Sequence, residues 1–422
     1  MKFLMSILNK TIFTGFAPNL TKRDTLLALS YLCLPWRWLK LRKGKQAELA
    51  QKKLQKFFNC QSAFVFDSGR SALYFALKSL GAKAGDEILV QAYTCIVVIN
   101  AINWTSACPV FIDIGDDFNI DPADLAKKIT AKTKILIIQH TFGQPAKLDE
   151  ILALARQNNL KIIEDCAHSL GATYQGKLSG TFGDIGMFSF GSDKVISCVR
   201  GGGLITNNEQ LAQKIKSYQK ELLPSRISKV LQHLFHYPIF FISKPLYGLY
   251  IGKLLLKLAK KLNIINKIIY QPEKIGERIN FYPAKLPNAL AEILNNQIDE
   301  ILTLNQHRKK IAGLYNKLIT NNLIKLPAQT RGDSESVYLR YPLLTKEPDK
   351  LLKFAKKNNI ILGDWYNAPV TPAQIALAKI GYLAGSCPKA EALARESVNL
   401  PTDRQIHEHQ ARKIIKIINS YK

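Results

Sequence analysis

Residues 134–165 read KILIIQHTFGQPAKLDEILALARQNNLKIIED, with an apolar run at each end and a helical pattern between the two runs. The runs KILIIQH (134–140) and KIIED (161–165) are short and rich in β-branched residues, which is typical of buried strands. Between them, Leu148–Gln157 has its apolar residues at the spacing of an amphipathic helix. A strand–helix–strand unit of this kind favours two parallel strands with the helix packed on their sheet.

The same alternation continues on both sides of this unit. Further strand-like runs are FVF (64–66), EILV (87–90), PVFIDI (109–114), GMFSF (186–190) and GGLIT (202–206). We therefore predict the α/β class, with a largely parallel sheet of seven strands flanked by helices on both faces. The predicted divisions are a basic N-terminal segment (1–56), a large domain (57–220), a basic apolar insertion (221–278), and a linking helix with a smaller α+β C-terminal domain (279–422).

Positive charge is concentrated in two parts of the chain, whose 422 residues carry a formal charge of +27. Residues 2–56 contain 12 Lys/Arg and 2 Asp/Glu, and residues 214–278 contain 13 and 3, so each segment has a net charge of +10. In both segments the basic residues alternate with large apolar ones, which suits an anionic membrane surface. An ordinary amphipathic insertion explains the same pattern. No recognition motif accompanies the charge, so we expect no nucleic-acid partner.

The cellular location is predicted from hydropathy and from the cysteines. Neither basic segment predicts a membrane-spanning helix, because Thr25–Trp36 is too short and Tyr237–Leu256 is interrupted by prolines and lysines. The seven cysteines are scattered and none has metal-ligand spacing, which favours a reducing cytosol and predicts no metal site. We expect a cytoplasmic protein, and peripheral attachment to the inner face of the plasma membrane is a hypothesis.

Polar residues that follow the predicted strands mark a ligand site, since ligands of such sheets bind at the carboxyl ends of the strands. Ser68, Gly69 and Arg70 come after the first strand and open a helix, where exposed amides and a positive charge suit a phosphate. A plain capped helix explains this segment equally. Asp165 ends another strand, where a half-buried carboxylate needs a cationic partner such as a protonated pyridinium. His168 follows three residues later and could lie over the same ring.

A third segment, FSFGSDK (188–194), leads into the glycine run 201–203. A lysine held out of water beside a glycine run can attack an aldehyde and form an imine, which makes Lys194 a candidate nucleophile. Ser189 could supply a hydroxyl to a phosphate. His140 and Tyr93 also lie near predicted strand ends, but structural roles explain them as well and neither is predicted to be catalytic.

Several ordered motifs give the sequence a specific resemblance. They are SGRSAL (68–73), GDEILVQAYT (85–94), HTFGQPAKLD (140–149), IIEDCAHSLGA (162–172), GDIGMFSFGSDK (183–194), GGG (201–203) and CPKAEALARESVNLPT (387–402). Over roughly residues 50–220 and 280–420, the chain resembles the DegT/DnrJ/EryC1/StrS sugar aminotransferases, which have the aspartate-aminotransferase-like fold (fold type I) and use pyridoxal 5′-phosphate (PLP).

The resemblance implies a role for each candidate residue. Lys194 would form the Schiff base with PLP and then move the proton, and Asp165 would pair with the pyridine nitrogen. His168 would lie beside the ring, while Ser68, Gly69 and Ser189 would hold the phosphate. The implied reaction transfers an amino group, usually from glutamate, to a keto-sugar carried by a nucleotide, for surface polysaccharide (lipopolysaccharide) or related glycan synthesis. The resemblance also implies a homodimer with sites completed by the partner chain.

The sequence departs from the family pattern in four places. Cys95 occupies the position at which family members normally have an aromatic ring stacked on the cofactor. Tyr93 is the residue expected to provide this stacking instead. Arg200 replaces an acidic residue before the glycines, and Lys285 replaces the arginine that the partner chain lends to the phosphate. The fourth departure is the long connection 220–278. Three alternatives therefore stay open: a PLP-dependent sugar dehydratase, an aminotransferase for other ketones, and a non-catalytic membrane-docked scaffold with this fold.

Overall fold

A computed structural model describes residues 11–328 and 334–422. The first ten residues of the basic N-terminal segment lie outside the described residues. Within these ranges, no helix combines the length and the apolar character that crossing a membrane requires.

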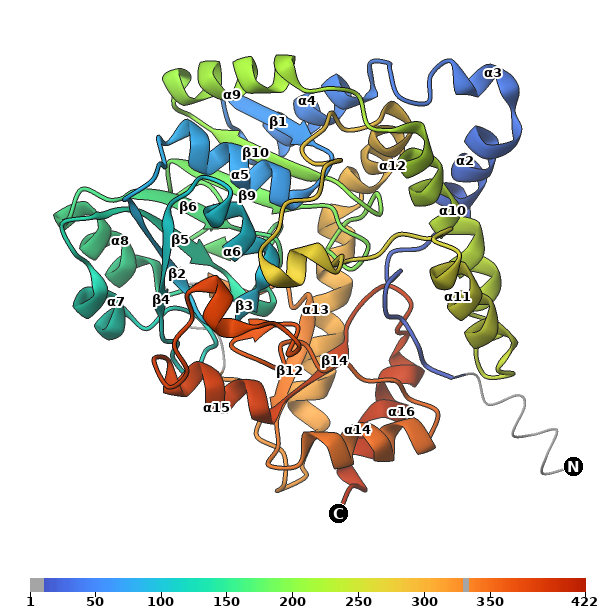
Figure 1. Cartoon of the computed structure of the whole chain (residues 1–422). Helices are drawn as coiled ribbons and strands as arrows, with labels where there is room; N and C mark the ends of the chain where they lie inside the picture. The colour runs from blue at the N-terminus through green and yellow to red at the C-terminus, as the bar shows by residue number, and fades with distance from the viewer. Residues whose placement is uncertain (1–10, 329–333) are drawn as a thin grey trace, which may run out of the picture.

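A seven-stranded sheet forms the centre of the molecule (Figure 1). Its strands lie in the order β1 (Ser62–Phe66), β10 (Gly202–Thr206), β9 (Ile185–Ser189), β6 (Lys161–Asp165), β5 (Thr133–Gln139), β2 (Glu87–Gln91) and β4 (Cys108–Ile112). Only β10 runs antiparallel to its neighbours β1 and β9, and the other pairs are parallel. Every strand coincides with a predicted run, so the largely parallel α/β sheet is confirmed.

Helices cover both faces of this sheet, because alternate residues of each strand point to opposite sides. In β5, Ile135 and Ile137 belong to the core on one face, whereas Leu136 and Ile138 belong to the core on the other face. The helices of the large domain are α4 (Gln46–Phe58), α5 (Gly69–Ser79), α6 (Ile96–Asn103), α7 (Pro122–Lys128), α8 (Leu148–Gln157) and α9 (Glu209–Glu221), with the 3₁₀ turn η1 (Thr141–Gly143).

The C-terminal part is smaller and of the α+β type, as predicted. Its helices α14 (Pro348–Lys357) and α16 (Glu408–Asn419) pack with the antiparallel pair β12 (Arg340–Leu344) and β14 (Ser397–Pro401). The predicted linking helix is divided into two helices, α12 (Asn288–Ile298) and α13 (Ile301–Leu318). The remaining short elements are β3 (Thr94–Cys95), β7 (Thr173–Tyr174), β8 (Lys177–Leu178), β11 (Ser334–Glu335), β13 (Val370–Thr371), η3 (Leu377–Ile380) and α15 (Pro388–Glu396).

The two basic segments lie side by side. The insertion forms α10 (Ile227–Ser243), α11 (Ile251–Lys261) and the 3₁₀ turn η2 (Pro272–Ile275), and the N-terminal segment forms α2 (Lys22–Cys33) and α3 (Pro35–Trp38). Helix α10 packs against α2, and the four helices make up one edge of the molecule (Figure 1). Residues that are about 200 positions apart in the sequence therefore share one surface.

Candidate active site

One pocket gathers the predicted residues at the carboxyl ends of β1, β6 and β9. The predicted residues that line it are Ser68, Gly69, Arg70, Asp165, His168, Ser189 and Lys194. Because three separate strands deliver these side chains to one place, the fold builds the site directly from the parallel sheet.

The start of α5 forms one wall of the pocket. Ser68 caps the helix by accepting a hydrogen bond from the Ser71 amide at 3.2 Å, and its hydroxyl lies 2.8 Å from the Ser71 hydroxyl. Gly69 permits the end of β9 to come close, since a Cβ at this position would lie 3.0 Å from the Cβ and Oγ of Ser189. Helix amides, two serine hydroxyls and a glycine thus surround a space suited to a phosphate.

Asp165 presents a buried carboxylate to the pocket. One of its oxygens accepts a hydrogen bond from the Ala167 amide at 3.0 Å. Burial raises the pKa of this carboxyl group, although the Ala167 amide and the charge of Lys194 act in the opposite direction. A protonated ring nitrogen against the free oxygen would stabilise the ionised carboxylate, which is the role predicted for Asp165.

His168 is a neutral imidazole in this environment, because burial holds its pKa well below the usual range. Its Nδ1 accepts a hydrogen bond from the Phe142 amide at 3.3 Å, so the ring hydrogen is on Nε2. The Nε2 atom lies 3.5 Å from the hydroxyl of Tyr366, whose ring is nearly parallel to the imidazole. The histidine is therefore held at the pocket by contacts on both ring nitrogens.

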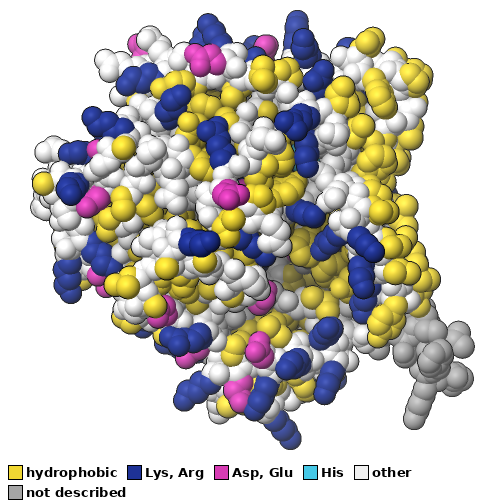
Figure 2. Space-filling model, in the orientation of Figure 1, with side chains coloured by type: hydrophobic (Ala, Val, Ile, Leu, Met, Phe, Trp, Pro, Cys, Tyr) yellow, Lys and Arg dark blue, Asp and Glu magenta, His cyan; other side chains and the backbone are white. Residues whose placement is uncertain are grey.

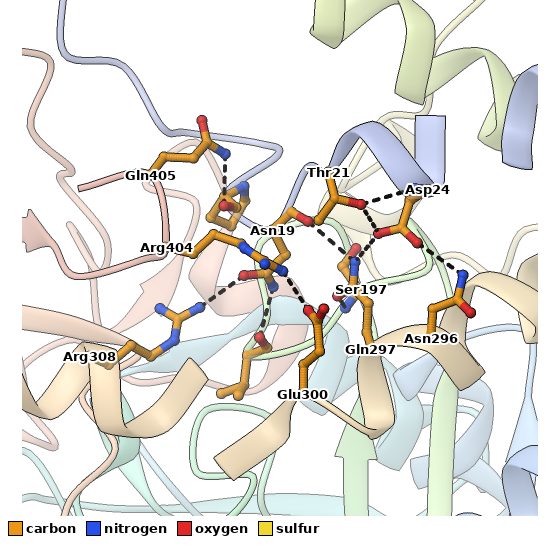
Figure 3. Close-up of polar contacts among 12 residues, drawn as sticks. Asn19, Thr21, Asp24, Ser197, Asn296, Gln297, Glu300, Arg308, Arg404 and Gln405 are labelled. Atoms are coloured by element: carbon orange, nitrogen blue, oxygen red, sulfur yellow. Dashed lines mark hydrogen bonds and ion pairs between the residues drawn. The ribbon is translucent and has the colours of Figure 1, made fainter. Parts of the chain in front are cut away.

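The loop that carries Lys194 is held by a buried residue from the N-terminal segment. The side-chain amide of Asn19 donates to the carbonyl oxygens of Lys194 at 2.7 Å and Val195 at 2.8 Å. Its own oxygen accepts a hydrogen bond from Arg308 at 3.2 Å, and Gln297 donates to its carbonyl at 3.3 Å (Figure 3). Sequence reasoning missed Asn19, because no motif in this segment points to a site that is 175 positions away.

A second cavity adjoins the pocket. The two share Asp193, Ile268 and Trp365. Asp193 is partly buried next to Lys194 and forms an ion pair with Arg340 at 3.1 Å. The second cavity is lined by the N-terminal segment around Phe13 and Phe16 on one side and by the C-terminal domain on the other, so further space lies directly beside the first pocket.

Arg70 and Arg200 hold the insertion over the pocket. Arg70 pairs with the buried Glu273 and donates to the carbonyl of Ile268 at 2.8 Å. Arg200, which replaces the expected acidic residue, donates to the carbonyl of Lys267 at 2.6 Å and is buried. The departure at Arg200 and the long insertion thus belong together, because the guanidinium anchors the inserted segment. A phosphate contact by Arg70 stays a prediction.

The aromatic substitute suggested by the sequence is absent from the pocket. Tyr93 is fully buried in the core, and its hydroxyl lies 2.6 Å from that of Ser397. It points away from the site because the backbone turns there with a positive φ of 66°. Cys95 does line the pocket, together with Trp365 and Tyr366 from the C-terminal domain. These two rings are the aromatic residues that the sequence did not reveal, since no motif surrounds them.

Two further candidates lie outside the pocket. Lys285 is exposed, and its amide donates to the carbonyl of Leu223 at 2.9 Å. Since its predicted role is in a partner chain's site, that role stays a prediction. His140 lies 3.1 Å from Glu164, and its other nitrogen accepts from the Ala146 amide at 3.1 Å. Three further backbone amides donate to the Glu164 carboxylate, which explains the cluster of His140, Glu164 and Cys166 as structural.

The residues present fit PLP. The buried carboxylate of Asp165, the lysine that follows β9, and the helix start at Ser68 and Gly69 with Ser189 beside it all line the same pocket. Asp165, Lys194 and the phosphate cradle would hold the cofactor, which supplies an electron sink when bound. Fold and site together define the class of PLP-dependent enzymes of fold type I.

The chain belongs to the DegT/DnrJ/EryC1/StrS aminotransferase family, whose model matches residues 33–233 and 258–419. It is a PLP-dependent aminotransferase of the sugar-modifying kind, which confirms the family, the cofactor and the enzyme class expected from the motifs. The family model leaves residues 234–257 unmatched, and these lie in the α10–α11 insertion.

Individual relatives agree with this assignment. A "Pleiotropic regulatory protein" of Geobacillus stearothermophilus is 28% identical over 84% of this chain and 83% of its own length. A GDP-perosamine synthase of Escherichia coli O157:H7 is 38% identical, but over 46% of this chain and 53% of that enzyme, so the match spans about half of each. Among solved structures, Helicobacter pylori PseC, an aminotransferase involved in the biosynthesis of pseudoaminic acid, gives a TM-score of 0.74 at 21% identity, covering 97% of this chain and 98% of that one. That similarity supports the fold.

Proposed function

We propose that this enzyme transfers an amino group from glutamate to a keto-sugar linked to a nucleotide, in the synthesis of a surface polysaccharide or a related glycan. The observation that carries the proposal is that Lys194, Asp165 and the phosphate cradle meet in one pocket, which adjoins a second cavity. We assign the first pocket to the cofactor and the adjoining cavity to the non-reacting part of the substrate.

Each residue has a separate task in this proposal. The amine of Lys194 would hold the cofactor through its aldehyde carbon and would move a proton to and from the substrate carbon. Asp165 would hold the ring nitrogen in its protonated form. Ser68, Gly69 and Ser189 would hold the phosphate end, and His168 would lie beside the ring. Arg340 and Asp193 position the segment next to Lys194.

The substrate class rests on the relatives. They include GDP-perosamine synthases, a dTDP-3-amino-3,6-dideoxy-alpha-D-galactopyranose transaminase of Aneurinibacillus thermoaerophilus and the spore coat polysaccharide protein SpsC of Bacillus subtilis. Their names cover more than one nucleotide and more than one sugar. Because several of these names contain a nucleotide-linked amino sugar, a nucleotide-linked keto-sugar is the acceptor we propose for this chain.

The proposed assembly is a cytoplasmic homodimer that attaches peripherally to the inner face of the membrane. Lys285 supports the dimer, because it is exposed beside the end of β1 and available to a second copy. In that copy it would add a positive charge near the phosphate cradle. The membrane surface is supported by the basic and apolar helices of the insertion.

The test begins with the absorbance spectrum of the purified protein with PLP. We expect a yellow band that glutamate bleaches, and no such band in Lys194→Ala. A panel of keto-sugars on GDP, dTDP and UDP should then restore the band at different rates. A protein that takes up PLP but responds to none of the sugars would overturn the substrate class, and a protein that never takes up PLP would overturn the whole proposal.

A further inference from the structure

The outer face of α11 is a row of apolar side chains in contact with solvent. Ile251, Leu254, Leu255, Leu258 and Leu262 are 38–66% exposed. Their spacing puts them on one side of the helix, while Leu256 and Ala259 face inward and are buried. The inner face of α11 is therefore packed against the protein, and a second apolar face is exposed to solvent. Such a face on a water-soluble surface marks an interaction site.

This row continues over the neighbouring elements. The α10–α11 turn adds Leu249 and Tyr250, α10 adds Phe241 and Ile242, and α3 with the residue after it adds Trp36, Trp38 and Leu39, all of them exposed. Figure 2 shows hydrophobic side chains along the whole edge formed by α2, α3, α10 and α11, with Lys and Arg beside them. We call this surface, made of the residues named here and the row on α11, the apolar edge.

The charge of the two stretches that form the apolar edge is mostly positive. Between Glu221 and Glu273 the chain has eight Lys/Arg (Arg226, Lys229, Lys244, Lys253, Lys257, Lys260, Lys261, Lys267) and no acidic residue. Between Asp24 and Glu48 it has five (Arg37, Lys40, Arg42, Lys43, Lys45) and none. Two of these charges already have partners, since Arg37 pairs with Glu292 and Lys244 donates to the carbonyls of Thr14 and Ala17. On α11, Lys257 and Lys261 lie beside the exposed leucines. Cations next to apolar and tryptophan side chains complement an anionic interface with an apolar interior.

We infer that the apolar edge docks on an anionic lipid bilayer, with the leucines of α11 and the tryptophans of α3 inserted between headgroups and the lysines in contact with them. A second copy of the chain is a poorer occupant, because face-to-face association would bring two cationic surfaces together with no acidic residue in either segment to pair with them. The family model does not match residues 234–257, which carry the part of this surface on α10, the α10–α11 turn and the first turns of α11, whereas α3, Leu258 and Leu262 lie within matched residues.

The apolar edge is also connected to the second cavity. Phe13 lines this cavity and stacks on Tyr247 of the α10–α11 turn, with ring centroids 4.3 Å apart. Phe16 lines the same cavity and lies under the ammonium group of Lys260, 4.4 Å from its ring centre. The N-terminal segment therefore lies between the bilayer surface and the cavity. This geometry delivers the product beside the membrane, where glycan-assembling transferases that use it would be bound.

The test measures binding of the full-length protein to sedimented vesicles of phosphatidylcholine alone or mixed with phosphatidylglycerol. At low salt we expect at least about tenfold stronger binding to the anionic vesicles, and release at high salt because headgroup attraction is screened. Leu254→Glu with Leu258→Glu should reduce the anionic binding at least about tenfold. The matched control is Leu323→Glu with Leu383→Glu, which changes two equally exposed leucines in the C-terminal part. The control should bind as the wild type does.

Thermal unfolding and the PLP spectrum of both double variants show whether they are folded, and neither pair lies in the active site. Equal recovery of the wild type with neutral and anionic vesicles would overturn the inference. So would unchanged binding by Leu254→Glu with Leu258→Glu. A concentration-dependent dimer that this variant abolishes without any lipid would instead identify the edge as an interface between copies. These outcomes are independent of the sugar on which the enzyme acts.

Discussion

Asn19 holds the backbone of Lys194 from behind, donating to the lysine's carbonyl oxygen at 2.7 Å and to that of Val195 at 2.8 Å. Both N–H donors of this side-chain amide therefore hold the loop that carries Lys194. The amide oxygen is in turn held by Arg308, which is fully buried. The position of Lys194 thus depends on a residue outside the sheet, in a segment that precedes the large domain.

Asn19→Leu is expected to loosen the Lys194 loop while leaving the pocket's other groups in place. Two buried hydrogen bonds at about 1 kcal/mol each correspond to a loss of about 10- to 30-fold in the rate at which glutamate bleaches the PLP band. The matched control is Asn321→Leu, since Asn321 also donates to two backbone carbonyls, those of Ile418 and Tyr421, far from the site. If both variants lose stability equally and neither loses rate, Asn19 has a structural role alone.

Gly69→Ala is expected to weaken PLP binding about tenfold. The added methyl group would lie 3.0 Å from the Cβ and Oγ of Ser189, so the strand end and the helix start that form the phosphate cradle must separate. Titration of the yellow band with PLP measures the dissociation constant. Gly313→Ala serves as the control, because a Cβ there meets no atom within 4 Å and the residue lies inside α13. That change should stabilise the protein by about 0.5–1 kcal/mol and leave PLP binding unchanged.

The sheet and its strand ends could be predicted because they depend on local sequence. Each run such as KIIED is buried on both faces, and the residue after it must lie at the carboxyl edge, so Asp165 and Ser189 followed from the strands alone. The resemblance to a family then assigned Lys194. The strand positions, the residues at their ends and the lysine assigned by the resemblance therefore indicate the same site.

The rest of the site comes from long-range packing, which one sequence does not encode locally. Tyr93 looked available for the cofactor, but the positive φ at this residue turns its side chain into the core. Tyr366 lines the pocket from a loop with no motif, and Asn19 reaches it across 175 positions. Arg200 appeared as a departure from the family and is explained only by the segment that it anchors.

The buried histidine of α10 predicts how stability depends on pH. Burial lowers the pKa of His236 to about 3, and its Nε2 donates to the carbonyl of Phe16 at 3.0 Å. The unfolded chain takes up a proton near pH 6.5 and the folded chain does not, so stability is present above this pH and is lost as the pH falls toward 3. Between pH 7 and pH 5 this histidine should cost about 2 kcal/mol.

His236→Gln keeps a hydrogen-bond donor for Phe16 and removes the titration. Urea unfolding at pH 7 and pH 5 measures the free energy of unfolding of both proteins. His168 and His233 are buried with lowered pKa values and are present in both, so the difference between the proteins isolates position 236. An equal loss of stability in the variant and the wild type would refute this account.

Asp165→Asn is expected to keep the fold and slow the chemistry. The amide has nearly the same shape and can still accept from Ala167, but it carries no charge to hold a protonated ring nitrogen. Loss of a charge-assisted hydrogen bond of about 1.5–3 kcal/mol corresponds to roughly 10- to 100-fold in the bleaching rate with glutamate. The control is Asp149→Asn, because Asp149 is an exposed carboxylate that accepts a hydrogen bond from the Tyr174 hydroxyl, and this change should leave the bleaching rate unaltered. A full rate in Asp165→Asn would exclude the proposed role.

The ion pair between Arg70 and Glu273 gives the last prediction. Glu273 is completely buried, and Arg70 is buried beside it at the start of α5. Glu273→Gln leaves a guanidinium without a counter-charge in a site from which water is excluded, so we expect a loss of about 3 kcal/mol or more in the free energy of unfolding. Arg70→Gln leaves the carboxylate unpaired and should cost a similar amount.

The double variant distinguishes a stabilising interaction between Arg70 and Glu273 from independent effects of the two substitutions on the free energy of unfolding. If the two groups mainly stabilise each other, Arg70→Gln with Glu273→Gln loses at least about 1 kcal/mol less than the two single variants added together. Strict additivity would mean that the pair is not coupled. Because Arg70 immediately follows Gly69, Glu273→Gln should also weaken PLP binding. The double variant should recover part of the lost affinity for PLP. The insertion would then act on the cofactor site through a single buried charge.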